Sequence, residues 1–364
     1  MKLASCQLYR SSLQCKKPFV IATDVCDACH GLILKLTADN GLVGWGEAVP
    51  DRRLTGETMD GVLQVLREHL LPPLFERDLW QLESLHREVF ASVRSSSAVA
   101  AVDIAIHDLL SRASQITLCQ FLGGPARPVR TNYSIGITTS QAAADEAQEL
   151  VRHGYNAIKL KVGEDPHEDV ARVRAVRRAI GPQVRLRIDA NEGWTVPAAL
   201  KALQAMEELD IELVEQPVAK ENLDGFAYLR HQQSIPVAAD ESVHSPEDAL
   251  RLLRAGAVDI LNIKLMKSGG LLPARRIQSI ARAFGAQLMV GGMVGESRLA
   301  VSAATALASA WGFEYADLDA DLLVVDPLSD EGASVDGEWR VPSERPGLGL
   351  DHLNHGALEL LWEQ

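Results

Sequence analysis

Short apolar runs alternate with helix-length segments along most of the chain after Thr131. Each run has the length and composition of a buried strand, and each intervening segment carries apolar residues at helical spacing. Eight such units in succession are typical of a closed barrel of parallel strands. The predicted strands are 132–137, 157–161, 184–189, 211–215, 236–240, 258–264, 287–291 and 313–317, with helices between them, among others at 142–153, 168–179, 197–209, 246–255 and 274–284.

An antiparallel meander is predicted at the start of the chain. Strand runs at 31–36 and 41–48 flank the sequence Asp39-Asn40-Gly41, which is a strong hairpin signal. Polar loops are predicted at about 16–27 and 50–57. Loops of this kind often carry binding residues, so both are candidate parts of a site.

The region 58–123 has a helical pattern, which is clearest at 99–113, and the breaker Gly123-Gly124-Pro125 follows it. In the tail, a short strand is predicted at 339–341. The fold class is therefore α/β, a modified TIM-like (β/α) barrel with an N-terminal α+β capping domain. The predicted division is 1–125 for the capping domain, 126–320 for the barrel and 321–364 for a segment that returns toward the capping domain.

The composition narrows the class of protein. The chain has 364 residues, 47% hydrophobic residues and a formal net charge of −13. This balance supports a large core and disfavours nucleic acid or an anionic membrane as a partner. No run is long enough to span a membrane and no signal-peptide core is found, so a cytoplasmic protein is expected; a homo-oligomer is left open. The pair Cys26 and Cys29 has no matching second pair, and we interpret it as incidental.

Polar side chains end five successive apolar runs of the predicted barrel. They follow one another at intervals of 24 to 28 residues, which is the length of one β/α unit. Each would therefore stand at the C-terminal mouth of its strand, where barrel enzymes build their active sites. The five residues are Lys161, Asp189, Glu215, Asp240 and Lys264.

Three of these residues are carboxylates on neighbouring strands. A lone carboxylate at such a point is usually the cap of the next helix. Three together would repel one another unless a cation lies between them. An oxygen-only ligand set suits Mg²⁺ better than zinc, which prefers His or Cys, so a magnesium site is predicted at Asp189, Glu215 and Asp240.

The lysines predict proton transfer. Lys159 and Lys161 alternate on one strand and point the same way, and Lys264 lies across the barrel from them. A lysine near a cation and a second ammonium can have its pKa lowered toward neutrality, so that it can accept a weakly acidic proton. Lysines on both faces of one carbon would allow 1,1-proton transfer, which inverts that centre.

These residues resemble the enolase superfamily, and within it the muconate-lactonising subgroup, along nearly the whole chain. The motifs are highly specific for the superfamily and weakly specific for the reaction. They are Ala157-Ile158-Lys159-Leu160-Lys161, Asp189-Ala190-Asn191, Val214-Glu215-Gln216-Pro217, Ala239-Asp240-Glu241-Ser242, the run 262–270, the helix 101–109 with Leu122-Gly123-Gly124, and Trp45-Gly46-Glu47-Ala48.

The resemblance implies roles for the matching positions. It implies that the three strand-end carboxylates bind Mg²⁺ and that Lys161 and Lys264 are the two acid/base catalysts. It also implies that Lys159 helps to hold a substrate carboxylate. Asn191 and Glu241 would support the residues that touch the metal and the substrate.

The motif Asp317-Leu318-Asp319 narrows the expected reaction. In the dipeptide epimerases that this subgroup contains, an Asp-x-Asp at this point binds the α-ammonium group of the dipeptide. Muconate cycloisomerases and o-succinylbenzoate synthases lack the pair, and they stay open as alternatives. A third alternative is a barrel that binds a metal or ligand without turnover, against which the intact Lys161 and Lys264 argue. An acidic stretch that merely starts a loop would also explain the motif, since Asp321 follows.

Three positions bear on the choice of dipeptide. Asp24 stands where relatives that prefer Ala-Glu carry an arginine, and Asp51 lies on the second polar loop. We therefore expect poor activity on Ala-Glu and better activity on a cationic or apolar second residue, unless Asp24 turns away or pairs with Lys16 or Lys17. The stretch 291–297, which contains Met293, is one residue longer than in those epimerases and would border the substrate.

Overall fold

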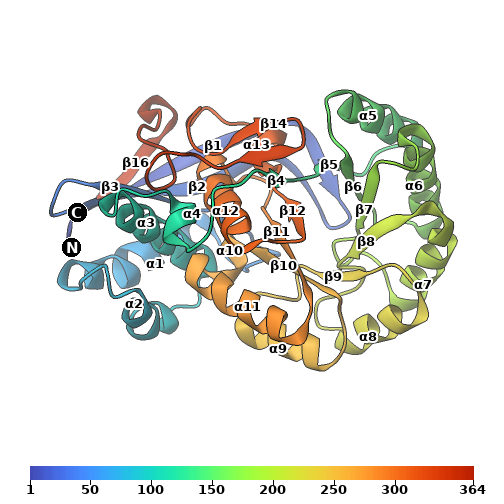
Figure 1. Cartoon of the computed structure of the whole chain (residues 1–364), viewed down its shortest axis with the longest axis horizontal. Coiled ribbons are helices and arrows are strands. Elements are labelled where there is room, and N and C mark those ends of the chain that lie inside the picture. Colours follow the sequence, from blue (N-terminus) through green and yellow to red (C-terminus); the bar gives the residue numbers. More distant parts are fainter.

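An antiparallel sheet begins the chain, and one long helix packs against it (Figure 1). The computed structural model describes residues 1–364. Strands β1 (Leu3–Ile21), β2 (Asp24–Ala38) and β3 (Val43–Ala48) pair in order, and the predicted hairpin at 39–41 joins β2 to β3. Helix α3 (Ser96–Ala113) supplies most of the apolar surface that covers this sheet.

The first predicted polar loop, 16–27, is instead the end of the β1–β2 hairpin. Phe19 pairs with Cys26 and Ile21 with Asp24 across it, and Ala22-Thr23 form the turn. The polar residues that suggested a loop fall in a bulge of β1, where the register shifts between Gln14 and Phe19. The second predicted loop, 50–57, contains neither helix nor strand.

Short helices complete the capping domain before and after α3. Their bounds are α1 (Met59–Val65), a π-helical turn (Leu66–Leu70), a 3₁₀ segment (Pro72–Glu76), α2 (Leu82–Glu88), a 3₁₀ turn (Phe90–Ser92) and α4 (Leu118–Phe121).

Eight parallel strands form the second sheet, as the sequence predicts. Their order is β12-β11-β10-β9-β8-β7-β6-β5, so each strand lies beside its neighbour in the chain. The outer predicted residues of five strands lie outside the observed strands. The strands are β5 (Tyr133–Ile135), β6 (Ala157–Lys161), β7 (Arg185–Asp189), β8 (Ile211–Glu215), β9 (Val237–Ala239), β10 (Ile260–Lys264), β11 (Gln287–Gly291) and β12 (Tyr315–Asp317).

Helices lie around this sheet, and Figure 1 shows α5 to α9 and α11 along its outer side. Most begin at a side chain that caps the first turn, such as Thr139 at α5 and Asp165 at α6. The helices are α5 (Ser140–Arg152), α6 (Pro166–Ile180), α7 (Val196–Ala205) with a 3₁₀ turn (Glu207–Leu209), α8 (Leu223–Gln232), α9 (Pro246–Arg254), α10 (Leu265–Ser268), α11 (Leu271–Phe284) and α12 (Arg298–Trp311).

Side chains join the two ends of the eight-stranded sheet, where no backbone ladder pairs β5 with β12. Asn132 Nδ2 donates to Asp317 Oδ1 at 2.6 Å, and Ser134 N donates to Asp319 Oδ2 at 2.6 Å. Arg187 Nη1 donates to Asn132 Oδ1 at 2.8 Å and to the carbonyl of Ala316. These buried bonds close the barrel.

The chain after the barrel pairs with β1 of the capping domain and with β4, the short strand before the barrel. Helix α13 (Ala320–Leu323) leads to β13 (Val324–Val325), and β16 (Glu359–Glu363) follows a 3₁₀ turn (His355–Ala357); both strands pair with β1. Strands β14 (Ser334–Asp336) and β15 (Trp339–Val341) form a small sheet with β4 (Val129–Arg130). The predicted strand at 339–341 and the return to the capping domain are thus confirmed. No helix is both long and apolar enough to cross a membrane.

Two sets of hydrogen bonds, among others, fix the capping domain over the barrel. The buried carboxylate of Glu47 in β3 accepts hydrogen bonds from the N–H groups of Ser297 and Ala300, both at 3.1 Å, at the start of α12. At the far end of the β1–β2 hairpin, Ile137 N donates to the carbonyl of Val20 at 2.8 Å. The hairpin therefore reaches from the capping domain to the first barrel unit (Figure 1).

Replacing Gly46 by alanine tests the packing of α3 on β3. An added Cβ would overlap the backbone carbonyl of Ala101, which cannot move without shifting α3. We expect Gly46→Ala to lower the free energy of unfolding by about 3 kcal/mol. The control Gly61→Ala lies in the exposed turn of α1 and should change it by no more than about 1 kcal/mol. Urea denaturation measures both, and equal stabilities would contradict the packing argument.

Candidate active site

Parallel register brings the five predicted strand-end residues to one mouth of the barrel. Lys161, Asp189 and Glu215 end β6, β7 and β8, and the register pairs Lys161 with Asp189 and Asp189 with Glu215. Asp240 directly follows β9, and Lys264 ends β10. Because three strands separate β6 from β10 on the barrel wall, the two lysines approach the mouth from opposite sides.

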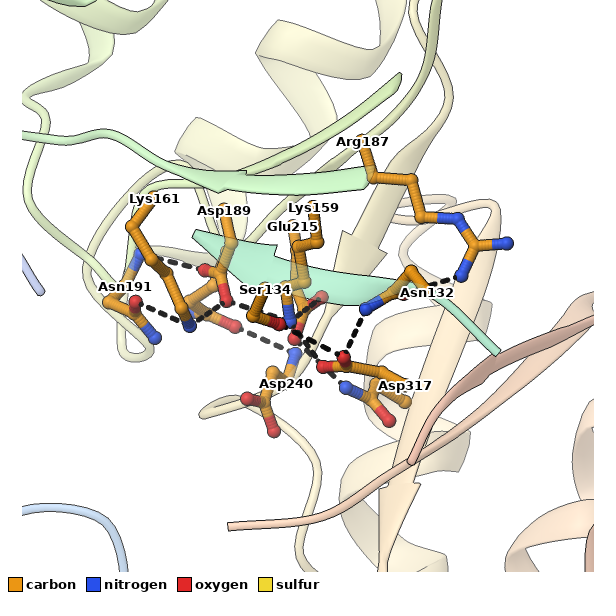
Figure 2. Close-up of polar contacts among 12 residues, drawn as sticks. Asn132, Ser134, Lys159, Lys161, Arg187, Asp189, Asn191, Glu215, Asp240 and Asp317 are labelled. Carbon is orange, nitrogen blue, oxygen red and sulfur yellow. Dashed lines mark hydrogen bonds and ion pairs between the residues drawn. The ribbon is translucent and has the colours of Figure 1, made fainter. Parts of the chain in front are cut away.

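Two oxygen atoms orient Lys161 (Figure 2). Its Nζ donates to Asp189 Oδ2 at 2.6 Å and to Asn191 Oδ1 at 3.0 Å. Asn191 is held in turn, because its amide donates to Glu241 Oε1 at 2.9 Å. The two predicted supporting residues therefore act on the lysine in a chain of hydrogen bonds.

Lys159 lies deeper than the sequence suggests. Its side chain is 1% exposed, and its Nζ is 2.6 Å from Asp317, 2.9 Å from Glu215 and 3.0 Å from Asp189. The ammonium thus neutralises carboxylates from three strands and does not line the cavity. Direct contact between Lys159 and a substrate carboxylate stays a prediction.

On the opposite side, Asp240 receives two ammonium groups. Lys264 Nζ is 2.6 Å from Asp240 Oδ2, and the fully buried Lys267 donates to Asp240 Oδ1. Lys267 also donates to the backbone carbonyls of Asp240 and Asn262. It fixes the carboxylate from behind, whereas the side chain of Lys264 reaches the cavity.

The carboxylates retain oxygen atoms for a cation. Glu215 Oε2 and Asp240 Oδ2 are buried and accept no hydrogen bond, although ammonium groups lie close to both. Glu215 Oε1 accepts only from Asn262 Nδ2, at 2.9 Å. Buried oxygen atoms without donors cost free energy unless a cation contacts them. With carboxylate oxygen atoms from three adjacent strands, this set fits a hard divalent cation.

Charge shifts the pKa values here in opposite directions. Burial and the neighbouring Asp189 raise the pKa of Glu215 to about 7. Burial would lower the pKa of Lys264, but Asp240 and Glu215 outweigh it and raise the pKa. This is opposite to the lowering expected from the sequence. The physical reason is that more carboxylates than ammonium groups surround the side chain of Lys264.

Asp317 and Asp319 lie together but in different surroundings. Asp317 accepts from Lys159 at 2.6 Å, from Asn132 and, at 3.3 Å, from Ser134 Oγ, and its pKa is lowered because Lys159 outweighs its burial. Burial and the charge of Asp317 raise the pKa of Asp319 to about 7. The second oxygen of Asp319 has no protein donor, and both residues line the cavity.

A cavity of about 530 Å³ lies between the barrel mouth and the capping domain. The barrel contributes polar groups to its wall, and the hairpin end and the loops 50–60 and 291–297 contribute much of the apolar surface. The predicted site residues that line it are Asp24, Asp51, Lys161, Asn191, Asp240, Glu241, Lys264, Met293, Asp317 and Asp319. A cavity of this size holds a small molecule.

The three positions that are predicted to influence the choice of dipeptide differ in how firmly their side chains are held. Asp24 is exposed, and its carboxylate is 3.9 Å from Arg53; Lys17 pairs with Glu146, and no ion pair joins Asp24 to Lys16 or Lys17. Asp51 uses one oxygen to accept the N–H groups of Arg53 and Leu54 within its own loop. Met293 is buried at the cavity wall.

Several groups of the site were missed from the sequence. Asn132 and Ser134 donate hydrogen bonds to Asp317 and Asp319. The available signal was that they lie two residues apart on the predicted strand 132–137, so their side chains point to the same face. Lys267 stands three residues after Lys264 within a quoted motif, but only the fold reveals that it contacts Asp240. Arg53, which is not among the predicted site residues, lines the cavity and lies 3.9 Å from Asp24.

Fold and site together define a class of protein: a barrel with a cluster of buried carboxylates at its mouth and lysines on two sides of one cavity. Comparison with known families agrees. Residues 6–123 match the N-terminal domain of the mandelate racemase and muconate lactonizing enzymes, and residues 142–354 match the enolase C-terminal domain-like family. The chain therefore belongs to the enolase superfamily, in its mandelate racemase and muconate-lactonising group.

Individual relatives are similar over nearly their whole length. A hydrophobic dipeptide epimerase from Enterococcus faecalis is 36% identical, covering 97% of this chain and 100% of that protein. An L-Ala-D/L-Glu epimerase from Bacillus subtilis is 35% identical, with 96% and 97% covered. An L-Lys-D/L-Arg epimerase from Methylococcus capsulatus is 34% identical, with 96% and 99% covered. The crystal structure of the Enterococcus faecalis enzyme, complexed with Mg and L-Leu-L-Tyr, superposes with a TM-score of 0.93 at 36% identity, covering 97% of this chain and 100% of that one.

Proposed function

We propose that the protein is an isomerase that epimerises a dipeptide at the α-carbon of its C-terminal residue and depends on Mg²⁺. The observation that carries the proposal is the pair Lys161 and Lys264, which face one cavity from opposite sides of the barrel. Two amines placed in this way can take a proton from one face of a carbon and return one to the other. The dipeptide epimerases that are 34–36% identical to the chain support this class of reaction.

The three strand-end carboxylates would hold the cation. Their oxygen-only donor set and the buried atoms of Glu215 and Asp240 without hydrogen-bond donors fit Mg²⁺. When bound, the ion would supply positive charge. This charge would stabilise the negative charge that builds up on a substrate carboxylate as the α-proton leaves. Lys267 supports this arrangement because it fixes the carboxylate of Asp240 from the side away from the cavity.

The two lysines would share the proton transfer. In one direction Lys161 enters the step as the neutral amine, takes the α-proton and leaves an enediolate. Lys264 enters as the ammonium and donates a proton to the opposite face of the same carbon. In the reverse direction the two exchange roles. Asp189 and Asn191 contribute by aiming Lys161 into the cavity.

The carboxylates at the end of β12 would bind the amino terminus of the substrate. Asp317 is ionised beside Lys159, and Asp319 has an oxygen without a protein donor at the cavity wall. An α-ammonium group placed here would offset the burial and the repulsion that raise the pKa of Asp319. This chemistry argues against a cycloisomerase or o-succinylbenzoate synthase, whose substrates have no amine.

Proton NMR of a dipeptide library in D₂O with Mg²⁺ tests the proposed function. An epimerase exchanges the α-proton signal of the C-terminal residue for deuterium, forms a diastereomer and leaves the number of heavy atoms unchanged. The same dipeptides with an acetylated amino terminus should react at least about 10-fold more slowly, because the ammonium contact is lost. Elimination or cyclisation products would favour the lyase and cycloisomerase alternatives, and no exchange with any substrate would favour a binding protein.

Removal of the metal should abolish activity. We expect excess chelator to stop turnover and added Mg²⁺ to restore it, and Asp189→Asn to lower kcat/KM by at least about 100-fold because a ligand and a partner of Lys161 are both changed. Asp145→Asn on the exposed face of α5 is the control. Unchanged turnover in excess chelator would remove the assignment of a metal site.

Each catalytic lysine should be needed for inversion. Lys161→Ala and Lys264→Ala should each lower epimerisation by about 1,000-fold or more, whereas the exposed Lys16→Ala should not. Each active-site variant should still exchange the α-proton of one diastereomer with D₂O, since one base remains. If Lys264→Ala epimerises at the normal rate, the two-base mechanism is wrong.

We further propose that glutamate is a poor second residue and that a cationic or apolar one is preferred. Asp24 places a carboxylate at the cavity where a glutamate side chain would need a cation, and Ile21 and Met293 add apolar surface. The contact with Arg53 is exposed, so solvent weakens both this ion pair and the repulsion between Asp24 and a glutamate side chain, and the expected preference is modest.

Asp24→Arg should therefore raise kcat/KM for Ala-Glu and lower it for Ala-Lys, each by about 10-fold, while Ala-Leu changes least. Asp27→Arg is the matched control, because this aspartate lies on the same hairpin but does not line the cavity. Steady-state kinetics with the three dipeptides measure the effect. A wild-type preference for Ala-Glu would refute the charge argument.

A further inference from the structure

Three thiol groups meet at the end of the β1–β2 hairpin, outside the carboxylate cluster. The sulfur of Cys26 is 2.9 Å from that of Cys29 and 3.5 Å from that of Cys15, and all three lie within 4.8 Å of one another. No disulfide joins them. From the sequence, the pair Cys26 and Cys29 is interpreted as incidental because it has no matching second pair. Cys15 is 11 residues from Cys26 in the sequence and is brought near it only by strand pairing.

The backbone holds the cluster on three sides. Cys15 lies in β1 next to Val324 of β13, and Cys26 and Cys29 lie in β2. On the barrel side, Gly295 of the loop after β11 packs directly on Cys29, and a Cβ added there would lie 2.9 Å from the sulfur. The thiols thus sit where the hairpin, the C-terminal segment and the barrel loop meet.

We propose that Cys15, Cys26 and Cys29 form a binding site for Zn²⁺ that is separate from the catalytic carboxylates. Zinc bound by thiolates at about 2.3 Å in tetrahedral geometry separates the sulfur atoms by about 3.8 Å. The separations of 2.9 Å and 3.5 Å lie below that value and the third is at most 4.8 Å, so rotation of the side chains away from Cys26 would create the triangle. A fourth position, which water can fill, is open because Cys26 and Cys29 line the cavity.

The surroundings favour a thiophilic cation over a simple pair of cysteines. A disulfide uses two sulfur atoms, whereas three converge here. Soft thiolate ligands select zinc over Mg²⁺. Asp24 and Asp27 add negative potential nearby. On binding, each thiol releases its proton to solvent and each sulfur donates an electron pair to the ion.

Bound zinc would cross-link β1 to β2 at the end of the hairpin that borders the cavity, because all three ligands belong to these two strands. Cys15 pairs with Val324 of β13, and Cys29 contacts Gly295 of the loop after β11. Cys26 pairs with Phe19, which lines the cavity. The ion would therefore restrain the surface that carries Ile21 and Asp24. This role needs no part of the proposed epimerase chemistry and stands independently of it.

Metal binding by the reduced protein in saturating Mg²⁺ tests the site. Co²⁺ as a zinc substitute should produce a thiolate-to-metal charge-transfer band in the near ultraviolet, which carboxylate ligands cannot produce. Zn²⁺ should bleach that band at one equivalent, with a dissociation constant below about 1 µM in competition with a chromophoric chelator. It should also protect three thiols from a disulfide reagent.

Single variants identify the ligands. Cys15→Ser, Cys26→Ser and Cys29→Ser should each abolish the band and weaken zinc binding by at least about 100-fold. Cys119→Ser, which removes a buried thiol elsewhere, should retain both. Thermal melting shows whether each variant is folded, and the partly exposed Cys15 and Cys26 tolerate serine more easily than the buried Cys29. Zinc binding that persists in Cys26→Ser, or that produces no charge-transfer band with Co²⁺, would overturn the proposal.

Discussion

The buried charges at the barrel mouth have to balance, and the arrangement of the site depends on this constraint. An uncompensated buried charge costs several kcal/mol, so each carboxylate must touch an ammonium group or a bound cation. Four carboxylates and four lysines meet this condition in two groups of ion pairs, one around Lys159 and one around Asp240. They are Asp189, Glu215, Asp240 and Asp317 with Lys159, Lys161, Lys264 and Lys267.

The group of ion pairs around Lys159 also helps to close the barrel. Asp317 accepts from Lys159 and from Asn132 of the first barrel unit, while Asp319 accepts from the backbone of Ser134. Because no backbone ladder joins β5 to β12, these side chains replace one. The residues proposed to bind the substrate ammonium are thus also residues that hold the fold, and their substitution affects stability as well as activity.

The capping domain acts through a few defined contacts with the barrel. Glu47 accepts from the first turn of α12, and the hairpin end bonds to Ile137. Between these two points lie the cavity, the loop containing Met293 and the three-thiol cluster. Groups that differ in sequence position by more than 250 residues therefore share one enclosed space, which lets the capping domain tune the choice of substrate without changing the chemistry.

The sequence by itself determined the barrel, its strand ends and the polar residues at its mouth, because strand length, strand-to-strand spacing and side-chain alternation are local properties. Only the tertiary structure decided what depends on distant segments meeting. Strand pairing turned the predicted loop 16–27 into a hairpin, brought Cys15 beside Cys26, and placed Lys267 behind Asp240. It also buried Lys159 beneath the cavity, since the carboxylates that stabilise its charge lie 30 to 158 residues further along the chain.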